Sequence, residues 1–451
     1  MKQALLIIFF LLSSCAAIEK DPGFKEISKE VLDRTGKEVY WNEGTAADKT
    51  VRDKITLMLS TSVTSAVAIQ IALLNNNHLQ ATYEELNIAQ SDLVEAGLLT
   101  NPIFDAEVRI HKGGKTGLEL AVVQNFIDLV FLRLRKAAAE AAFQSSKLKV
   151  IKSVVDLASD VEREFYNYQA AEAKLNLQKH ILSASAASFQ LAQNLRIAGN
   201  ITELSAASES AFYEESKIEL RKSEVHVLKS REKLNGLMGL WGNDTDWKST
   251  SELDSPKKED IESADLERKA LKRSLDLGII KWELNEAANN LGIAEPWGVF
   301  NDAGLGATGE REAESGEWGV GPAFSIPIPI FNQGQPGIAR ASAVLKAKHE
   351  NYKGSAINLR ASVRAEIESL LALKDEANYY KKVLIPLRKK IVHENQLQYN
   401  AMQLGAFELF KAKKDEIEAE NQYIETLKDY WITNANLNQI LNGSLNLNEG
   451  M

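Results

Sequence analysis

The feature that most limits how this chain can fold is a stretch of 81 residues, from 118 to 198, that contains neither glycine nor proline. These two residues interrupt most helices, and helices of globular proteins average about 10 to 14 residues. Apolar residues recur in the stretch at every seventh position, namely Val154, Val161, Tyr168, Leu175, Leu182 and Phe189. The spacing predicts one coiled-coil-like helix from about Leu132 to Ala198, roughly 100 Å long.

The second half of the chain carries a similar pattern. The residues Val363, Leu370, Ala377, Leu384 and Ile391 keep the same spacing, and we expect Pro386 to kink or restart this helix. The stretch "RIAGNITEL" is echoed by "MQLGAFEL", with Gly199 and Gly405 lying 206 positions apart (405 − 199). The chain is therefore interpreted as a unit of about two hundred residues that occurs twice in tandem.

Each unit is expected to contain a helix, a pair of strands, a long helix, a sharp turn and a second long helix. The first helix is predicted over Ser62 to Ala96 in one unit and over Asp265 to Ala294 in the other. The predicted ranges are 55–245 for the first unit with strands at about 102–126, 246–262 for a polar linker, 263–443 for the second unit with strands at about 296–331, and 444–451 for a C-terminal tail.

The motif "GLGATG", Gly304 to Gly309, matches the G-x-G-x-x-G turn of dinucleotide-binding proteins. That turn needs a following helix and an acidic residue about 20 positions later. The glycine-broken sequence "EREAESGEWGVG" follows instead, and no Asp or Glu occurs between Glu317 and Glu350. We therefore expect these glycines to lie in a curved strand that enters a hairpin loop.

The first residues resemble an export signal. Lys2 precedes an apolar run from Ala4 to Leu12 and then small residues, which is typical of a secretory signal peptide over residues 1–14. The end of the run resembles a bacterial lipobox, which implies that Cys15, the single cysteine of the chain, is acylated. Residues 15–54 would then form a lipidated N-terminal segment. Because Ala16 rather than Asp follows the cysteine, the resemblance implies the outer membrane. An ordinary cleaved signal is the alternative.

The composition argues against several function classes. A net charge of −9 disfavours nucleic acid as a partner, since such binding needs clustered Lys and Arg. The six histidines are scattered, and His393 begins an H-E-x-x-H pattern that Leu397 interrupts. The sequence therefore predicts no metal site, no cofactor and no enzyme activity.

The chain as a whole resembles the TolC-like outer-membrane efflux factors over nearly all of its mature length. The resemblance is carried by Asn101-Pro102, by "FSIPIPIFNQG" from Phe324 to Gly334, by the turns at Gly199 and Gly405, and by the closing "YIETLKDYWITNANLNQILNG". It implies a mainly α fold with a small β part, built as two tandem repeats of long antiparallel helices that each carry a β-hairpin. It further implies a homotrimer with one twelve-stranded barrel in outer-membrane lipid above a periplasmic α-helical barrel.

The resemblance also implies where partners bind. The turns Ala198-Gly199-Asn200 and Leu404-Gly405-Ala406 are expected to meet a periplasmic adaptor, which connects the chain to an inner-membrane pump. Glu203 and Glu408 follow the turns at positions that match by offset, and they are candidates for a periplasmic constriction. Solvated acids at helix starts are the alternative. Lys411 stands where related channels can carry a further acid.

These observations predict the lipid-anchored exit duct of a tripartite efflux or type I secretion-like system. The alternative is a periplasmic coiled-coil lipoprotein that acts as a scaffold or adaptor without a pore. Heavy-metal cations as cargo follow only from the resemblance. Trp297 and Trp318 near the strands are expected either at a membrane interface or in a buried core.

Overall fold

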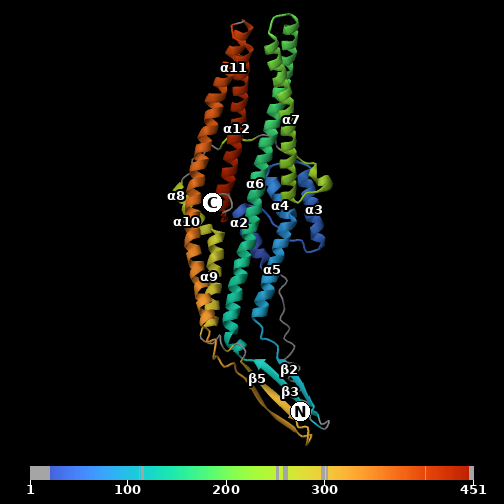
Figure 1. Cartoon of the computed structure of the whole chain (residues 1–451), viewed down its shortest axis with the longest axis vertical. Helices are drawn as coiled ribbons and strands as arrows, with labels where there is room; N and C mark the ends of the chain where they lie inside the picture. The colour runs from blue at the N-terminus through green and yellow to red at the C-terminus, as the bar shows by residue number, and fades with distance from the viewer. Residues whose placement is uncertain are drawn as a thin grey trace. The chain divides into compact units, whose positions relative to one another are not determined.

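The computed structural model describes residues 21–110, 112, 116–249, 253–256, 263–295, 300, 303–401 and 403–445 (Figure 1). Cys15 and Trp297 lie outside these described residues. The chain is mainly helical with a small β part, as the sequence predicts.

The elements follow one another in this order: α2 (Phe24–Thr35), α3 (Ala46–Leu59), β1 (Ser62–Val63), α4 (Ser65–Asn75), α5 (Asn77–Ala96), β2 (Ile103–Ile110), β3 (Thr116–Asn125), α6 (Ile127–Ile197), α7 (Glu203–Met238), η1 (Gly242–Thr245), β4 (Lys248–Ser249), α8 (Ser263–Arg273), α9 (Leu275–Ala294), β5 (Gly304–Arg311), β6 (Trp318–Ser325), α10 (Gln335–Tyr379), η3 (Tyr380–Leu384), α11 (Ile385–Asn400) and α12 (Ala406–Leu441). Among the helices in the described ranges, none combines the length and the apolar character needed to cross a membrane.

The chain divides into two compact units, and each unit takes segments from both halves of the sequence. The first unit comprises residues 1–27, 82–150 and 275–356, and the second comprises residues 28–81, 151–274 and 357–451. The long helix α6 contributes to both units. These units are defined by contacts in space, and the two tandem ranges along the sequence stay a prediction.

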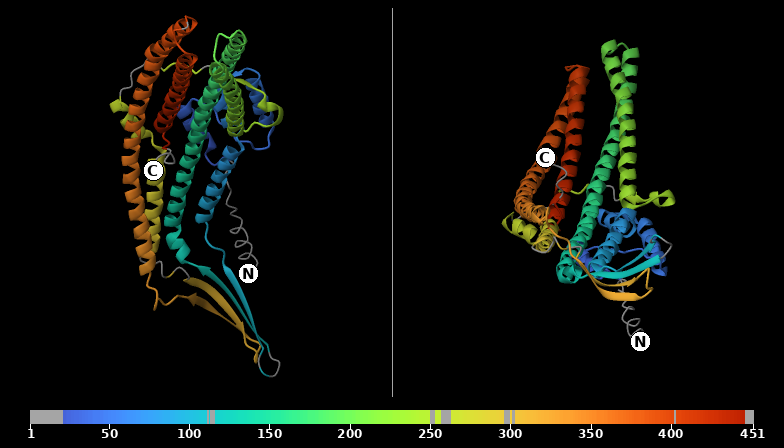
Figure 2. Two further views of the ribbon diagram at one scale, coloured as in Figure 1. Left: turned by 45° about the horizontal axis from the view of Figure 1, so that its top comes forward. Right: turned by 60° about the horizontal axis from the view of Figure 1, so that its bottom comes forward.

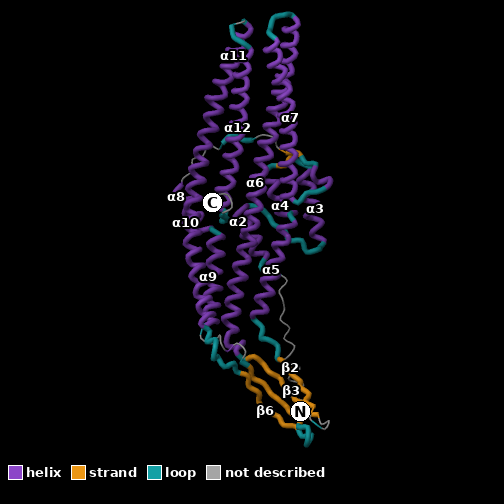
Figure 3. Tube along the Cα trace, viewed as in Figure 1, coloured by secondary structure: helices purple, strands orange, loops and turns teal. Residues whose placement is uncertain are grey.

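The first unit contains a four-stranded antiparallel sheet with the strand order β2-β3-β5-β6 (Figure 3). Strands β2 and β6 are its edges, and each has one neighbouring strand in the sheet. A small core of Ile127, Phe131 and Ala303 packs where α6 begins. The backbone N–H of Phe126 also donates to the carbonyl oxygen of Ala303 at 3.3 Å. The helix start and the strand pair are thus fixed to each other.

The second unit contains two helical hairpins, one formed by α7 with the last part of α6 and one formed by α11 with α12 (Figure 2). Its main core lies near the end of α7, where Val161, Phe165 and Tyr168 of α6 pack with Leu234, Met238 and Trp247. The indole N–H of Trp247 donates to the Asn235 side chain at 2.7 Å, which satisfies the one polar group that this tryptophan buries.

Arg34 in α2 connects three helices of this unit. Its guanidinium donates to the carbonyl oxygens of Arg273 at 2.8 Å and Asn442 at 2.7 Å, at the ends of α8 and α12, and to the Glu30 carboxylate at 2.8 Å. The last carbonyls of a helix have no amide partner within it, and a cation there is favoured by the helix dipole. Arg34 therefore supplies donors that two helix ends lack.

The predicted long helix is confirmed, since α6 is a single helix of 71 residues. The first three residues of the predicted seam, Val154, Val161 and Tyr168, are buried. Leu175, Leu182 and Phe189 are half-buried. Ile181, Ser185 and Ala192 are buried in this last part of the helix instead. The buried side of α6 thus rotates around the helix axis toward its C-terminal end.

The helix predicted over Ser62 to Ala96 is wrong as a single element, because it is divided into β1, α4 and α5. Asn76 ends α4 with an extended backbone, at φ −70° and ψ 119°. Its side chain accepts from the backbone N–H of Leu79 at 3.0 Å and donates to the carbonyl oxygen of Leu237 at 2.9 Å. An asparagine side chain that bonds to the backbone in this way competes with the helix. The helix predicted over Asp265 to Ala294 is likewise divided, at Ser274, into α8 and α9.

Pro386 lies in the first turn of α11, directly after the π-helical turn η3. Proline has no N–H to donate to the carbonyl four residues earlier, and a wider π turn adapts the helix to that loss. The helix therefore continues through the proline, and the burial of the predicted seam changes there. Val363, Leu370 and Ala377 are buried before the π turn, whereas Ile391 after it is exposed.

Candidate functional site: sheet faces and helix turns

The register of the sheet separates its side chains into two faces. Phe104 pairs with Val122, Val122 with Ala307, and Ala307 with Pro322, so these four residues share one face. By the same register this face carries the apolar residues Ala106, Val108, Ile110, Leu118, Leu120, Leu305, Trp318, Val320 and Phe324, and it also carries Thr116, Gln124 and Arg311 near the strand ends. Several of its large side chains are exposed, including Val320 at 85%. Such a face is suited to an apolar environment rather than to water.

The opposite face carries a row of three glutamates. Glu107 in β2 pairs with Glu119 in β3, which pairs with Glu310 in β5. Arg109 holds part of the row together through ion pairs to Glu107 at 2.9 Å and to Glu119 at 2.8 Å. Like charges that face each other across strands destabilise a sheet. The row was not predicted from the sequence, because only the strand register places Glu310 beside the other two.

The glycines of "GLGATG" lie in β5, as expected. A Cβ atom on Gly306 would overlap the backbone carbonyl of Val122, and one on Gly304 would lie 2.6 Å from a methyl group of Val123. The close approach of β3 therefore requires glycine at position 306. The glycines of the motif allow the close packing of strands β3 and β5. No helix follows the motif within the described residues before α10.

The turn at Ala198-Gly199-Asn200 is a helix C-cap. Gly199 has φ +73°, in the left-handed region that favours glycine. The backbone N–H of Gly199 donates to Arg196 and that of Asn200 donates to Leu195, both at 2.9 Å. The next helix begins with Thr202, whose hydroxyl accepts from the N–H of Ser205 at 3.1 Å. All three turn residues are exposed.

The turn at Leu404-Gly405-Ala406 has a different geometry. Gly405 has φ −76° and is the N-cap of α12, so the two turn glycines differ in backbone conformation and in position relative to their helices. A Cβ atom on Gly405 would lie 2.8 Å from a carboxylate oxygen of Glu408, which folds back over the glycine. A larger side chain at this position would require the flexible Glu408 carboxylate to move, but the backbone itself does not require glycine.

Glu203 and Glu408 do not occupy equivalent positions. Helices α7 and α12 are both 36 residues long, and each end of α12 lies 203 positions after the corresponding end of α7 (406 − 203 and 441 − 238). Glu203 is therefore the first residue of its helix, whereas Glu408 is the third of its own. The Glu203 carboxylate pairs with Arg196 across the turn at 2.7 Å. The sequence interpretation that Glu203 and Glu408 match by offset therefore misaligned these helix starts.

The two hairpins contact each other near their turns. The rings of Phe212 in α7 and Phe410 in α12 meet edge to face, with centroids 4.9 Å apart. A cleft of about 470 Å³ lies beside this contact, and a second of about 290 Å³ is lined by His180, Glu416 and Glu420. Burial and the Glu420 carboxylate raise the pKa of Glu416, while Lys389 opposes the rise.

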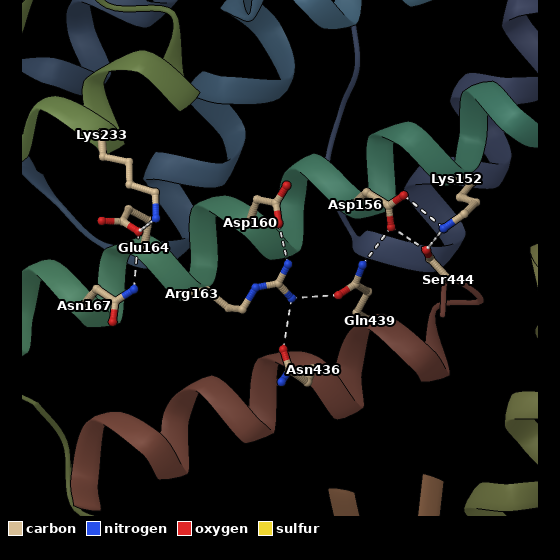
Figure 4. Close-up of polar contacts among 10 residues, drawn as sticks. All are labelled: Lys152, Asp156, Asp160, Arg163, Glu164, Asn167, Lys233, Asn436, Gln439 and Ser444. Carbon is tan, nitrogen blue, oxygen red and sulfur yellow. Dashed lines mark hydrogen bonds and ion pairs between the residues drawn. The ribbon is translucent and has the colours of Figure 1, made fainter. Parts of the chain in front are cut away.

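Further from the turns, α6 is bonded to α12 through partly buried polar side chains (Figure 4). The Arg163 guanidinium donates to Asn436 at 3.0 Å and to Gln439 at 2.7 Å, and Gln439 donates to Asp156 at 2.7 Å. Burial raises the pKa of Asp160 although Arg163 lies beside it. Within the part of the chain that the structure describes, no three His, Cys, Asp or Glu side chains are grouped so as to hold a metal ion.

Comparisons with known proteins identify the class of the fold. No family model matches the chain. The solved structure of CusC, described in connection with transmembrane channel formation, superimposes with a TM-score of 0.70 at 15% identity, over 85% of this chain and 93% of that one. The outer membrane channel CmeC of Campylobacter jejuni gives a TM-score of 0.68 at 16% identity, over 86% and 90%. The chain therefore has the fold of TolC-like outer-membrane efflux channels, and the resemblance seen in the sequence is confirmed for the fold.

A relative found by sequence is the cobalt-zinc-cadmium resistance protein CzcC of Cupriavidus metallidurans. It is 20% identical over 384 residues, which cover 84% of this chain and 90% of the relative. The chain thus spans most of the length of a protein whose name refers to resistance to metal cations.

Proposed function

We propose that the protein is the exit duct of a tripartite efflux system in the bacterial outer membrane and extends into the periplasm. The observation that carries the proposal is the sheet with one apolar face, one charged face and two open edges. Those edges must pair with further strands in lipid, because unpaired backbone groups there cost several kcal/mol each. The likeness to outer-membrane channels supports the same conclusion.

Four strands are too few to enclose a channel, since bacterial barrels start at about eight strands. We propose that three copies pool their sheets into one barrel of twelve strands, with the apolar face toward lipid. The row of Glu107, Glu119 and Glu310 then faces the lumen. The long helices of two tandem repeats would form the periplasmic tunnel, and acylated Cys15 would anchor the assembly.

We further propose that the turns Ala198-Gly199-Asn200 and Leu404-Gly405-Ala406 bind a periplasmic adaptor that links the duct to an inner-membrane pump. The exposure of Ala198, Gly199, Asn200 and Gly405 supports this assignment. Glu203 and Glu408 are proposed to form a cation-favouring constriction close to these turns. Because the two acids lie at different positions of their helices, they would form two rings rather than one.

The chain itself is proposed to conduct passively, with the driving energy supplied by the pump. Metal cations are the proposed cargo, on the strength of the relative named for cobalt, zinc and cadmium resistance. Carboxylates spread along the chain would attract such cations without retaining them. Deletion of the gene is expected to lower tolerance to these metals, and unchanged tolerance would remove this cargo.

The decisive experiment is the mass of the unheated protein in mild detergent, followed by conductance in a planar bilayer. We expect three chains per particle and cation-selective current, with weaker selectivity for Glu408→Gln. Unchanged selectivity in that variant would refute the constriction. A single chain without conductance would overturn the duct and favour a periplasmic scaffold.

A further inference from the structure

The smaller of the two clefts near the turns is lined by all four helices of the two hairpins, and we call it the hairpin cleft. Helix α6 contributes Leu177, Ile181 and Ala184, which are four and three positions apart and therefore lie on one side of the helix. The volume of the hairpin cleft is about 290 Å³. Pockets that hold small organic molecules measure about 300 to 1,000 Å³, so this one suits a molecule built on a single aromatic ring.

The walls of the hairpin cleft are largely apolar. Phe212 of α7 lines it from one hairpin, and Val392 of α11 and Ile417 of α12 line it from the other. The Phe212 ring is held in place by its edge-to-face contact with Phe410, at a centroid distance of 4.9 Å. An apolar molecule in the cleft would therefore be removed from water by side chains of both hairpins at once.

One carboxylate in this apolar cleft has no partner. Glu416 of α12 is half-buried, and among the described residues no ion pair or hydrogen bond reaches its carboxylate. Burial and the neighbouring Glu420 raise the pKa of Glu416, so its negative charge is only weakly compensated. A desolvated charge without a partner costs free energy, and a bound cation removes that cost.

The other polar groups of the cleft do not supply this cation. Lys413 also lines the cleft, but in the part of the chain that the structure describes its ammonium makes no ion pair with Glu416. Lys413 is also not among the groups that shift the pKa of Glu416. His180 is exposed, and Ser188 donates its hydroxyl proton to Glu209 at 2.6 Å. The cleft thus combines apolar walls with one carboxylate that can accept hydrogen bonds.

Neighbouring acids on α12 differ from Glu416 in this respect. Asp415 pairs with Arg388 at 2.9 Å, and Glu420 pairs with Lys389 at 2.9 Å. Glu418 is exposed to solvent and does not line the cleft. Glu416 is therefore the acid on this part of α12 that is partly desolvated and has no cation beside it.

We propose that the hairpin cleft binds a small organic cation, an amidinium or guanidinium group carried on one apolar ring. The cationic group donates two hydrogen bonds to Glu416, because its planar fork matches the geometry of a carboxylate. The ring packs on Ile181, Phe212 and Ile417. A ligand that contacts both hairpins favours the arrangement in which they touch. This inference goes beyond the proposed conduction of cargo, since the site lies between the helices of a single chain.

The test measures the binding of benzamidine to the full-length protein in a nonionic detergent by ligand-observed NMR. Benzamide and benzoate have nearly the same shape as benzamidine, but they are neutral and anionic, respectively. We expect benzamidine to bind at least tenfold more tightly than benzamide, because hydrogen bonds between charged groups are stronger than those of a neutral amide. Benzoate should not bind. Equal affinities for benzamidine and benzamide, or no binding of benzamidine, would overturn the proposal.

Two variants locate the site. Glu416→Gln should weaken benzamidine binding by roughly tenfold to a hundredfold and leave benzamide binding unchanged. Ala184→Phe, at an exposed position of α6, places a ring in the cleft and should weaken the binding of both molecules. Glu418→Gln is the matched control, because it removes the same charge from the same helix outside the cleft, and it should bind benzamidine as the unchanged protein does. Benzamidine binding that survives Glu416→Gln, or that Glu418→Gln weakens equally, would refute the assignment.

Discussion

Replacing Arg34 with methionine should loosen α2 from the ends of α8 and α12. The side chain is 10% exposed and makes hydrogen bonds of 2.7 to 2.8 Å to the carbonyl oxygens of Arg273 and Asn442. Hydrogen bonds from a charged donor contribute about 1.5 to 3 kcal/mol each, so losing two costs roughly 3 to 6 kcal/mol. Methionine keeps much of the volume, which limits the effect to the lost donors.

Hydrogen exchange of the amides in α2 measures this effect where it is expected. Each 1.4 kcal/mol corresponds to a factor of ten, so protection should fall by roughly a hundredfold or more if these amides exchange through release of α2. Lys25→Met, on the same helix and fully in solvent, is the matched control and should change nothing. Arg34→Lys should give an intermediate loss of protection, because a lysine side chain donates hydrogen bonds from a single nitrogen atom. Unchanged protection of α2 in Arg34→Met would refute the role assigned to this side chain.

Three further changes test other parts of the molecule. Gly306→Val should destabilise the folded protein by more than the about 1 to 3 kcal/mol typical of an overpacked side chain, because the new side chain would collide with the backbone of Val122. The yield of unheated trimer should therefore collapse, whereas Gly321→Val, with open space around it, should assemble. Equal yields of the two variants would contradict the close approach of β3 to Gly306. Gly405→Val should abolish copurification with the adaptor and leave the trimer mass unchanged, since its backbone φ suits any residue; retained adaptor binding would exclude this turn as the docking site. Burial raises the pKa of Glu416, so the folded state binds the proton of this carboxyl more tightly than the unfolded state does. The stabilisation that results from this proton is complete at acidic pH and is lost as the pH rises through the folded-state pKa. Glu416→Gln should therefore raise the thermal stability at neutral pH and have little effect at acidic pH, and a variant no more stable at pH 7 would contradict this account.

Periodicity was enough to predict the long helices, because a run without glycine or proline leaves the backbone few alternatives. It also excluded a nucleotide loop at Gly304 to Gly309, since the required helix does not follow. The break at Asn76 was not predictable in this way. It depends on a hydrogen bond to Leu237, which is distant in the sequence, and local propensity contains no information on such a partner.

The candidate sites were predictable only in part. Both turns could be located from their glycines, but the two glycines have different backbone angles, which the sequence does not distinguish. The glutamate row needed the register of three strands, of which β5 lies far from β2 and β3 in the chain. An alternation of Glu107 and Arg109 was visible in β2 alone, and it was the one local signal of a charged face.

The two open edges of the sheet bear on how such a protein matures. A single copy carries a sheet whose apolar face favours lipid and whose edge strands β2 and β6 each leave one side without a neighbouring strand. Hydrocarbon cannot solvate those backbone groups, so a lone copy is unstable both in the membrane and, through its apolar face, in water. For the proposed trimer, association of the copies should therefore precede or accompany insertion. The concentration of chains at the membrane, rather than the folding of any one of them, would then set the rate of maturation.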